Sequence, residues 1–121
     1  MTINESIRPR RTNTILYCDR WQETVRFYRD LLNLPVRVDK GWFVEFRLTE
    51  NACLSVADAA HASIASADGA GITLSWRVED IDILHDRMAS VGIDATPIRK
   101  IWGVRGFFAY DPEGHRIELW S

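Results

Sequence analysis

The segment from Phe107 to Trp120, FFAYDPEGHRIELW, predicts two strands joined by a tight turn. Aromatic residues before the turn, and alternating polar and apolar residues after it, are typical of strands in a half-buried sheet. Asp111-Pro112-Glu113-Gly114 supplies the reversal, because proline presets φ and glycine accepts the positive φ that closes such turns. Period two then places Glu118 and Trp120 on the same face of the second strand.

The composition predicts one globular domain with small or neutral partners. The chain has 121 residues, of which 46% are hydrophobic and 26% charged, enough for one core. A net charge of -2 argues against nucleic acid or an anionic membrane as a partner, and no apolar stretch resembles a signal or a membrane span. We therefore expect a cytoplasmic protein. Cys18 and Cys53 lie in no metal-binding spacing and predict buried free thiols.

Residues 1–12 are polar and without periodicity, so we expect a flexible N-terminal arm. A short buried strand, 14–18, precedes a helix that Asp19 is predicted to cap, with Gln22 at the capping-box position. The helix should end near Asn33, which tolerates the left-handed conformation.

Three short strands follow the first helix, and a connector over 59–71 precedes a second series of the same kind. There, Asp80 caps a helix that Gly92 ends, and His85 is expected to face solvent. The pattern predicts an α+β fold of two tandem βαβββ modules, module one over 13–58 and module two over 72–121. The later strands are expected at 36–38, 42–48, 52–57, 72–78, 95–101, 104–110 and 116–120.

The repeat includes the segments FYRDLLNLPV, VEDIDILHDRMASVGI and FFAYDPEGHRIELW. By the repeat and these segments, the chain resembles the vicinal oxygen chelate superfamily over residues 13–121. This superfamily includes glyoxalase I, extradiol dioxygenases, fosfomycin-resistance enzymes and bleomycin-binding resistance proteins. The resemblance implies a single domain whose curved mixed sheet surrounds a cleft, with the helices on the outer face. It also implies a homodimer.

The enzymes of this family hold a divalent cation at four strand positions, which here correspond to Asn13, Ser55, Thr73 and Glu118. Only Glu118 is a residue that the family uses as a ligand. Metal sites need several imidazole, thiolate or carboxylate groups, so we expect no metal and no other cofactor. His115 is expected to be structural, because its strand parity is opposite to that of Glu118.

Strand parity around these positions predicts a concave, aromatic-lined cleft. The expected ligand-binding residues are Tyr17, Ser55, Thr73, Arg77, Trp102, Phe108, Tyr110, Glu118 and Trp120.

Three functions remain open at this point. The first is a metal-independent binding protein of the bleomycin-resistance type, which would confer antibiotic resistance by holding a planar or aromatic small molecule. The second is an enzyme, either a glyoxalase-like lyase or isomerase or another member of the superfamily, with Glu118 as its catalytic general base. The third is a dimerisation or regulatory module whose own side chains fill the cleft.

Overall fold

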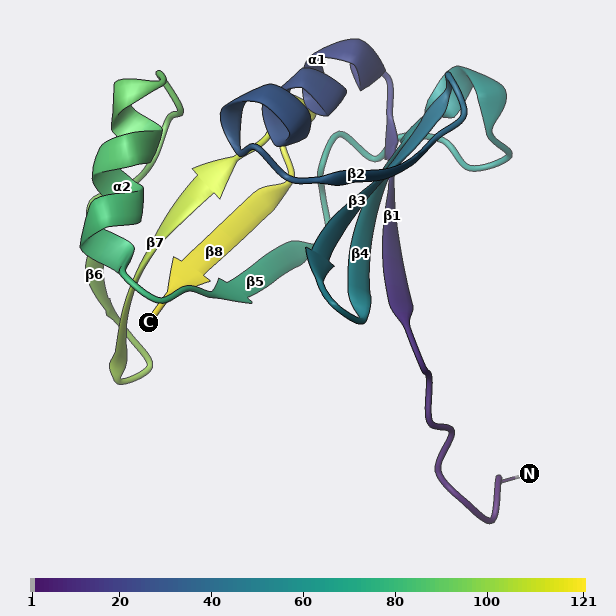
Figure 1. Cartoon of the computed structure of the whole chain (residues 1–121), viewed down its shortest axis with the longest axis horizontal. Helices are drawn as coiled ribbons and strands as arrows, with labels where there is room; N and C mark the ends of the chain where they lie inside the picture. Colours follow the sequence, from purple (N-terminus) through teal and green to yellow (C-terminus); the bar gives the residue numbers. More distant parts are fainter. Residues whose placement is uncertain (1) are drawn as a thin grey trace.

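The computed structural model describes residues 2–121, apart from the side chain of Ile101 (Figure 1). The elements of module one are β1 (Thr12–Cys18), α1 (Trp21–Arg26), a π-helical segment η1 (Phe27–Leu31), β2 (Val36–Asp39), β3 (Phe43–Thr49) and β4 (Ala52–Asp58). After a short 3-10 helix η2 (Ala59–His61), the elements of module two are β5 (Thr73–Arg77), α2 (Ile81–Ser90), β6 (Arg99–Ile101), β7 (Val104–Tyr110) and β8 (Arg116–Trp120).

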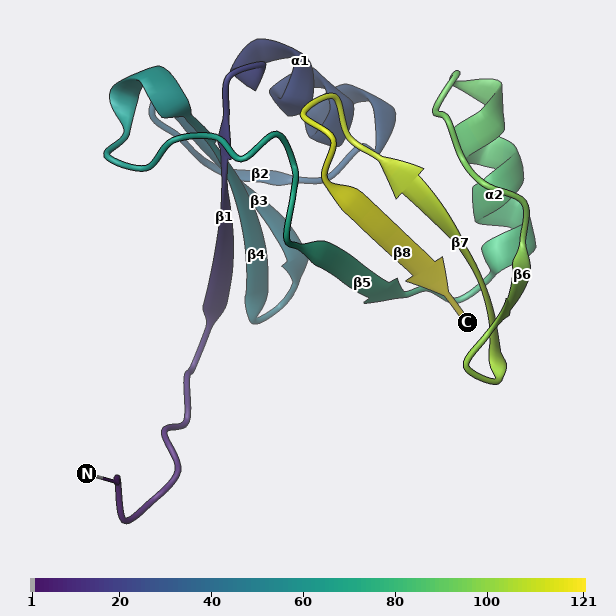
Figure 2. The same ribbon diagram turned by 180° about the vertical axis from the view of Figure 1, so that it is seen from behind.

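The predicted α+β architecture of two tandem βαβββ modules is confirmed, and each module forms its own four-stranded mixed sheet (Figures 1 and 2). The strand order is β1-β4-β3-β2 in the first sheet and β5-β8-β7-β6 in the second. In both sheets the first and last strands of the module pair in parallel, and the other pairs are antiparallel. Within residues 2–121, no helix is long and apolar enough to cross a lipid bilayer.

The start of the first helix differs from the prediction. Its N-cap residue is Arg20, and no side chain of the cap residue bonds to the helix, so Asp19 is not the cap. Instead the amides of Asp19 and Arg20 donate to the Glu113 carboxylate, at 2.9 and 2.8 Å. The second helix agrees with the sequence, since the amide of Ile83 donates to Asp80 at 3.1 Å. The positive φ of 54° at Asn33 also agrees.

Two predictions for module two are wrong. The strand expected at 95–101 is reduced to Arg99–Ile101, with an isolated bridge at Ala95, because Pro97 has no amide to donate to the sheet. His85 does not simply face solvent: its Nε2 lies 3.0 Å from the Thr96 carbonyl oxygen. Its ring also packs edge-on against Phe107, with 4.8 Å between the ring centres.

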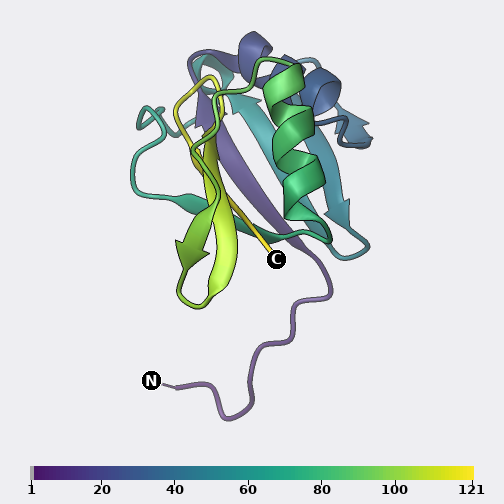
Figure 3. The ribbon, with the colours of Figure 1, turned by 90° about the vertical axis from the view of Figure 1, so that its left-hand side faces the viewer.

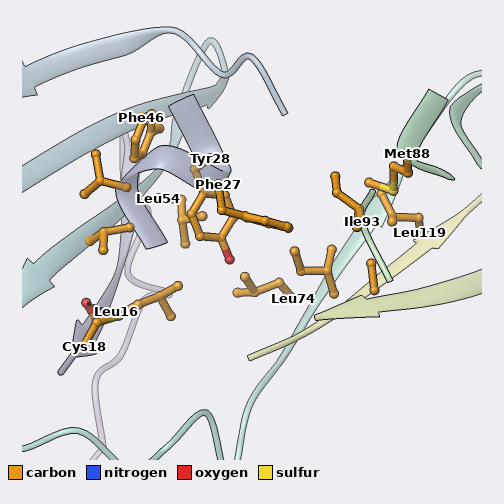
Figure 4. Close-up of a cluster of buried hydrophobic side chains, with 14 of the residues drawn as sticks. Leu16, Cys18, Phe27, Tyr28, Phe46, Leu54, Leu74, Met88, Ile93 and Leu119 are labelled. Atoms are coloured by element: carbon orange, nitrogen blue, oxygen red, sulfur yellow. Dashed lines mark hydrogen bonds between the residues drawn. The ribbon is translucent and has the colours of Figure 1, made fainter. Parts of the chain in front are cut away.

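Figure 3 shows the ribbon of both modules from the side on which α2 lies. One hydrophobic core joins the two modules (Figure 4). Phe27 and Tyr28 of η1 lie between the apolar side chains of module one and those of module two (Figure 4). Each sheet therefore buries one side against the shared core, and alternation along the strands leaves its other side facing outward. The labelled core residues are Leu16, Cys18, Phe27, Tyr28, Phe46, Leu54, Leu74, Met88, Ile93 and Leu119.

A buried carboxylate in the β7–β8 turn connects the modules across this core. Asp111 accepts hydrogen bonds from the Tyr28 hydroxyl and from Nδ1 of His115, both at 2.8 Å. It also accepts from the amides of Glu113 and His115, at 3.0 and 2.9 Å. Burial, followed by the charge of Asp111, raises the pKa of Tyr28 well above its usual value, so the phenol remains a donor. His115 is structural, as its parity predicted.

The same turn carries Glu113, which is also buried and holds the start of α1. Besides the amides of Asp19 and Arg20, its carboxylate accepts a hydrogen bond from the Ser66 hydroxyl. Burial favours a higher pKa, but the hydrogen bonds from Ser66, Arg20 and Asp19 outweigh it, so the pKa of Glu113 lies below its usual value. Asp111 and Glu113 thus make the turn the main polar connection between the modules.

Replacing Glu113 with glutamine should lower the free energy of unfolding at pH 7 by about 1–2 kcal/mol, since a charged acceptor is lost. The folded pKa lies below the unfolded value of about 4.3, so this stabilisation is present above that pH and is lost as the pH falls through the folded pKa. Urea unfolding of both proteins between pH 7 and 3 should therefore show the difference shrinking below pH 4. Exposed Glu79→Gln is the control, and a difference independent of pH would contradict this role.

The connector approaches this turn so closely that Gly69 has no room for a side chain. Its φ is +78°, and a Cβ there would overlap the backbone carbonyl of Gly114. Gly71 has nearly the same φ, +81°, but nothing lies within 4 Å of its Cβ position. We expect Gly71→Ala to cost about 1 kcal/mol from the positive φ alone. Gly69→Ala should cost about 1–3 kcal/mol more because of the overlap.

Thermal or urea unfolding of these two variants measures the difference directly. Equal stability of Gly69→Ala and Gly71→Ala would show that the connector does not press against the turn.

Candidate functional site

Apart from Trp102, the predicted site residues lie on the outward sides of the two sheets. We call the outward side of the first sheet, with Asn13, Tyr17, Glu45 and Ser55, the first face. The outward side of the second sheet is the second face, and it carries Thr73, Ser75, Arg77, Phe108, Tyr110, Arg116, Glu118 and Trp120. The register confirms that the members of each set point to the same side, because residues paired across strands do so.

The first face is a closed polar network. The Ser55 hydroxyl donates to Oδ1 of Asn13 at 2.7 Å, and Nδ2 of Asn13 donates to Glu45 at 3.2 Å. Arg37 donates to the second oxygen of Glu45 at 2.7 Å. Ser55 is fully buried at 0% exposure, so the structure gives it a positioning role in place of the predicted ligand contact. Glu45 was expected to reach the cleft from its strand, whereas Arg37 was not among the predicted site residues.

The residues at the family's metal positions do not fit a divalent metal. Asn13 and Ser55 satisfy each other, and Oγ1 of Thr73 accepts from the Arg116 guanidinium at 2.9 Å. Glu118 is the only anionic group of the four, and one carboxylate with an amide and two hydroxyls makes a poor site for zinc or iron.

A separate group of three carboxylates, Asp19, Asp68 and Glu113, lies near the start of α1. Their oxygens lie within 4.8 Å of one another. Glu113 already accepts from the amides of Asp19 and Arg20 and from Ser66, so its position is explained by its role in holding the segment before α1. We assign no metal to this group.

The second face combines an aromatic wall with one oriented carboxylate. Nε1 of Trp120 donates to Oγ of Ser75 at 3.1 Å, and that hydroxyl donates to Oε1 of Glu118 at 2.7 Å. Within the part of the chain that the structure describes, Oε2 of Glu118 has no hydrogen-bond partner. Phe108 and Tyr110 flank the carboxylate on β7, since Phe108 pairs with Glu118. An aromatic molecule would find both a stacking surface and a hydrogen-bond acceptor here.

Two arginines stack on this wall. The Arg77 guanidinium lies 5.6 Å from the centre of the Trp120 ring, and the Arg116 guanidinium lies 4.6 Å from that of Phe108. Arg77 thus contacts an aromatic ring, and no ion pair joins it to Glu118 among the described residues. Arg116 was not among the predicted ligand-binding residues, although it shares the strand face of Glu118 and Trp120.

One chain does not bring the predicted residues together in a single cleft. Tyr17 and Ser55 belong to the first sheet and the other predicted residues to the second, and no strand pairing joins the sheets within residues 2–121. Tyr110 is 46% exposed, so the second face is open to solvent. Trp102 is 98% exposed in the turn between β6 and β7, where its φ is 50°.

The cysteines offer no nucleophile to either face. Both are buried and free, as the sequence predicted. Burial, followed by the charge of Glu113, raises the pKa of Cys18 to about 12, so its reactive thiolate is scarcely populated at neutral pH. Burial is also the main cause of the raised pKa of Cys53.

Comparison with solved structures places the fold among small proteins of similar size. A glyoxalase/bleomycin resistance protein/dioxygenase from Nocardioides has a TM-score of 0.80 at 21% identity, over 97% of this chain and 85% of that chain. Lactoylglutathione lyase from Agrobacterium tumefaciens has a TM-score of 0.73 at 21% identity, over 90% of both chains. TnmS3, an antibiotic binding protein from Streptomyces sp. CB03234, has a TM-score of 0.76 at 15% identity, over 98% of both chains.

These identities are low enough that the structural likeness establishes the fold alone. No curated protein matches the sequence significantly. The sequence profile of the Glyoxalase/Bleomycin resistance protein/Dioxygenase superfamily, however, matches residues 11–119, nearly the whole chain. The DPEGH turn, the paired βαβββ modules and this match agree, and the protein belongs to the Glyoxalase/Bleomycin resistance protein/Dioxygenase superfamily.

Proposed function

We propose that this protein is a metal-independent, cytoplasmic binding protein for a planar or aromatic small molecule, which it holds against the second face. The observation that carries the proposal is the pairing of an open aromatic wall with one oriented carboxylate. Phe108, Tyr110 and Trp120 supply ring surface, and Ser75 fixes Glu118 through a 2.7 Å hydrogen bond. A ligand amine, amide or hydroxyl would donate to the remaining oxygen of Glu118 while its ring stacks.

The donor groups at the family's metal positions support binding without a metal. Asn13, Ser55 and Thr73 are neutral, and each already takes part in a hydrogen bond with a neighbouring side chain. A relative of similar structure is named an antibiotic binding protein, which is consistent with sequestration of an antibiotic-like molecule as the biological role.

We further propose that a second copy of the chain completes the site. The first face contributes Tyr17 and the Asn13–Ser55–Glu45 network, but it lies on a different sheet from the aromatic wall. In a homodimer, the first face of one protomer would cover the second face of its partner. The ligand would then be enclosed between a polar, preorganised surface and an aromatic one, as small-molecule sites usually are.

One observation favours an enzyme as the second candidate function. Glu118 has one oxygen held by Ser75 and another without a partner among the described residues, which is the geometry of a positioned base. Arg116 and Arg77 lie on the same face and would stabilise negative charge that develops on a substrate. A glyoxalase-like lyase or isomerase would use Glu118 to move a proton between carbon atoms.

Replacing Trp120 with alanine should weaken the binding of an aromatic ligand several-fold to about tenfold. Stacking is worth about 0.5–1.5 kcal/mol beyond area burial, and Ser75 also loses the indole donor. A panel of aromatic antibiotics and dyes, screened by quenching of tryptophan emission, would supply the ligand, and calorimetry would give the affinities. Trp42→Phe, in the turn between β2 and β3, is the control for loss of a fluorophore. Unchanged affinity in Trp120→Ala would exclude the second face as the site.

Replacing Glu118 with glutamine separates the two candidate functions, because the amide keeps an acceptor oxygen and loses basicity. For a binding protein we expect affinity to fall by about 1–3 kcal/mol, and neither protein to turn over methylglyoxal hemithioacetal or a catechol. Turnover is followed by absorbance and affinity by calorimetry. Wild-type turnover that Glu118→Gln abolishes, at unchanged affinity, would establish the enzyme instead.

A further inference from the structure

A pocket opens beside the second face, where the chain before β6 departs from β7. The amide of Thr96 donates to the Phe108 carbonyl at 2.8 Å, and the Phe108 amide donates to the Thr96 hydroxyl at 2.9 Å. Regular pairing resumes only at Arg99, which lies opposite Gly106. Pro97, between these points, has no amide for the sheet, so the chain bows outward and leaves a gap against β7.

The size of this pocket suits one aromatic ring. Its volume is about 230 Å³ and its walls are largely apolar. A cavity of about 150 Å³ holds benzene, and sites for drug-sized molecules begin at about 300 Å³. A single ring with a small substituent lies between these limits. The lining residues are Thr96, Pro97, Arg99, Lys100, Gly106, Phe107 and Phe108.

The charge of the pocket is positive. Arg99 and Lys100 line it and are exposed, and no carboxylate is among the lining residues. Within the described residues, neither cation forms an ion pair, whereas the neighbouring Arg105 is held by Asp82 at 2.8 and 2.9 Å. The cationic groups therefore remain available to an anion entering from solvent.

The pocket is continuous with the aromatic wall. The register aligns Arg99, Gly106, Trp120 and Arg77 in one row across β6, β7, β8 and β5. Gly106 has no side chain, so nothing at its position separates Arg99 from the Trp120 indole. Phe108, the next residue of β7 on this side, lines the pocket and pairs with Glu118.

We infer that this pocket is a subsite for a single aromatic ring that carries an anionic group, such as an aromatic carboxylate. The ring lies against Pro97 and Phe108, and the Arg99 guanidinium binds the anion. The inference rests on the proposed binding function and deepens it, because it assigns the ligand a negative charge at one end. The hydrogen-bond donor that meets Glu118 then lies at the other end of the ligand.

The test uses benzoate and its neutral analogue benzamide, titrated into the ¹⁵N-labelled full chain. Benzoate should shift the amide resonances of Thr96, Gly106 and Phe108, and it should bind at least fivefold more tightly than benzamide. Arg99→Gln should weaken benzoate binding about tenfold and leave benzamide unchanged. Arg87→Gln, an exposed arginine on α2, is the matched control and should change neither affinity. Gly106→Val should fill the pocket and weaken both ligands.

Any one of three results would overturn the subsite. These are equal affinity for benzoate and benzamide, benzoate binding that Arg99→Gln leaves unchanged, and amide resonance shifts confined to residues other than Thr96, Gly106 and Phe108. Failure of the proposed function would be a separate result, because that function is tested with larger aromatic ligands and with the Trp120→Ala variant. If those ligands bind through Trp120 while benzoate shows no Arg99 dependence, the subsite is wrong and the binding function stands. If benzoate binds through Arg99 while Trp120→Ala changes nothing, the subsite stands and the aromatic wall is wrong.

Discussion

The buried carboxylate of Asp111 is the interaction on which the arrangement of this protein depends. A buried charge is tolerated only when it is fully hydrogen-bonded, and Asp111 has the Tyr28 hydroxyl, the His115 ring and two amides around it. Tyr28 belongs to module one and the other groups to the turn of module two. Satisfying this carboxylate therefore fixes the two modules against each other. Glu113, two residues later, extends the connection to the start of α1.

This connection decides which sides of the sheets face outward. With Phe27 and Tyr28 packed between the modules, one side of each sheet is committed to the shared core. The outward sides of the sheets carry the candidate functional residues. These residues differ between the two sheets, although the strand topology of the two modules is the same. The first face satisfies its own polar groups through Asn13, Ser55 and Glu45. The second face carries the exposed ring of Tyr110 and, among the described residues, an oxygen of Glu118 without a partner, so ligand binding is expected to begin there.

A local defect in the second sheet adds specificity to this surface. Pro97 interrupts the strand pairing, the Thr96 hydroxyl replaces a backbone acceptor for the Phe108 amide, and the gap that results is lined by Arg99. Irregular pairing at a sheet edge commonly redirects side chains next to functional sites. A regular strand over 95–101 would have closed this pocket.

The sequence by itself determined the features that depend on a few neighbouring residues. Local conformational preferences account for the turn at the DPEG segment, the left-handed helix ends at Asn33 and Gly92, and the Asp80 cap. They also account for the strand alternation that places Glu118 and Trp120 on one side. Repetition of these local patterns was enough to predict two βαβββ modules. Only the tertiary structure decided that Glu113 holds the two residues before α1, more than ninety positions away in the chain. It also decided that Ser55 is buried and bonded to Asn13, and that the site residues are divided between two faces. Periodicity reports which side of a strand a residue occupies, whereas the partner that covers that side is set by packing between segments distant in the chain.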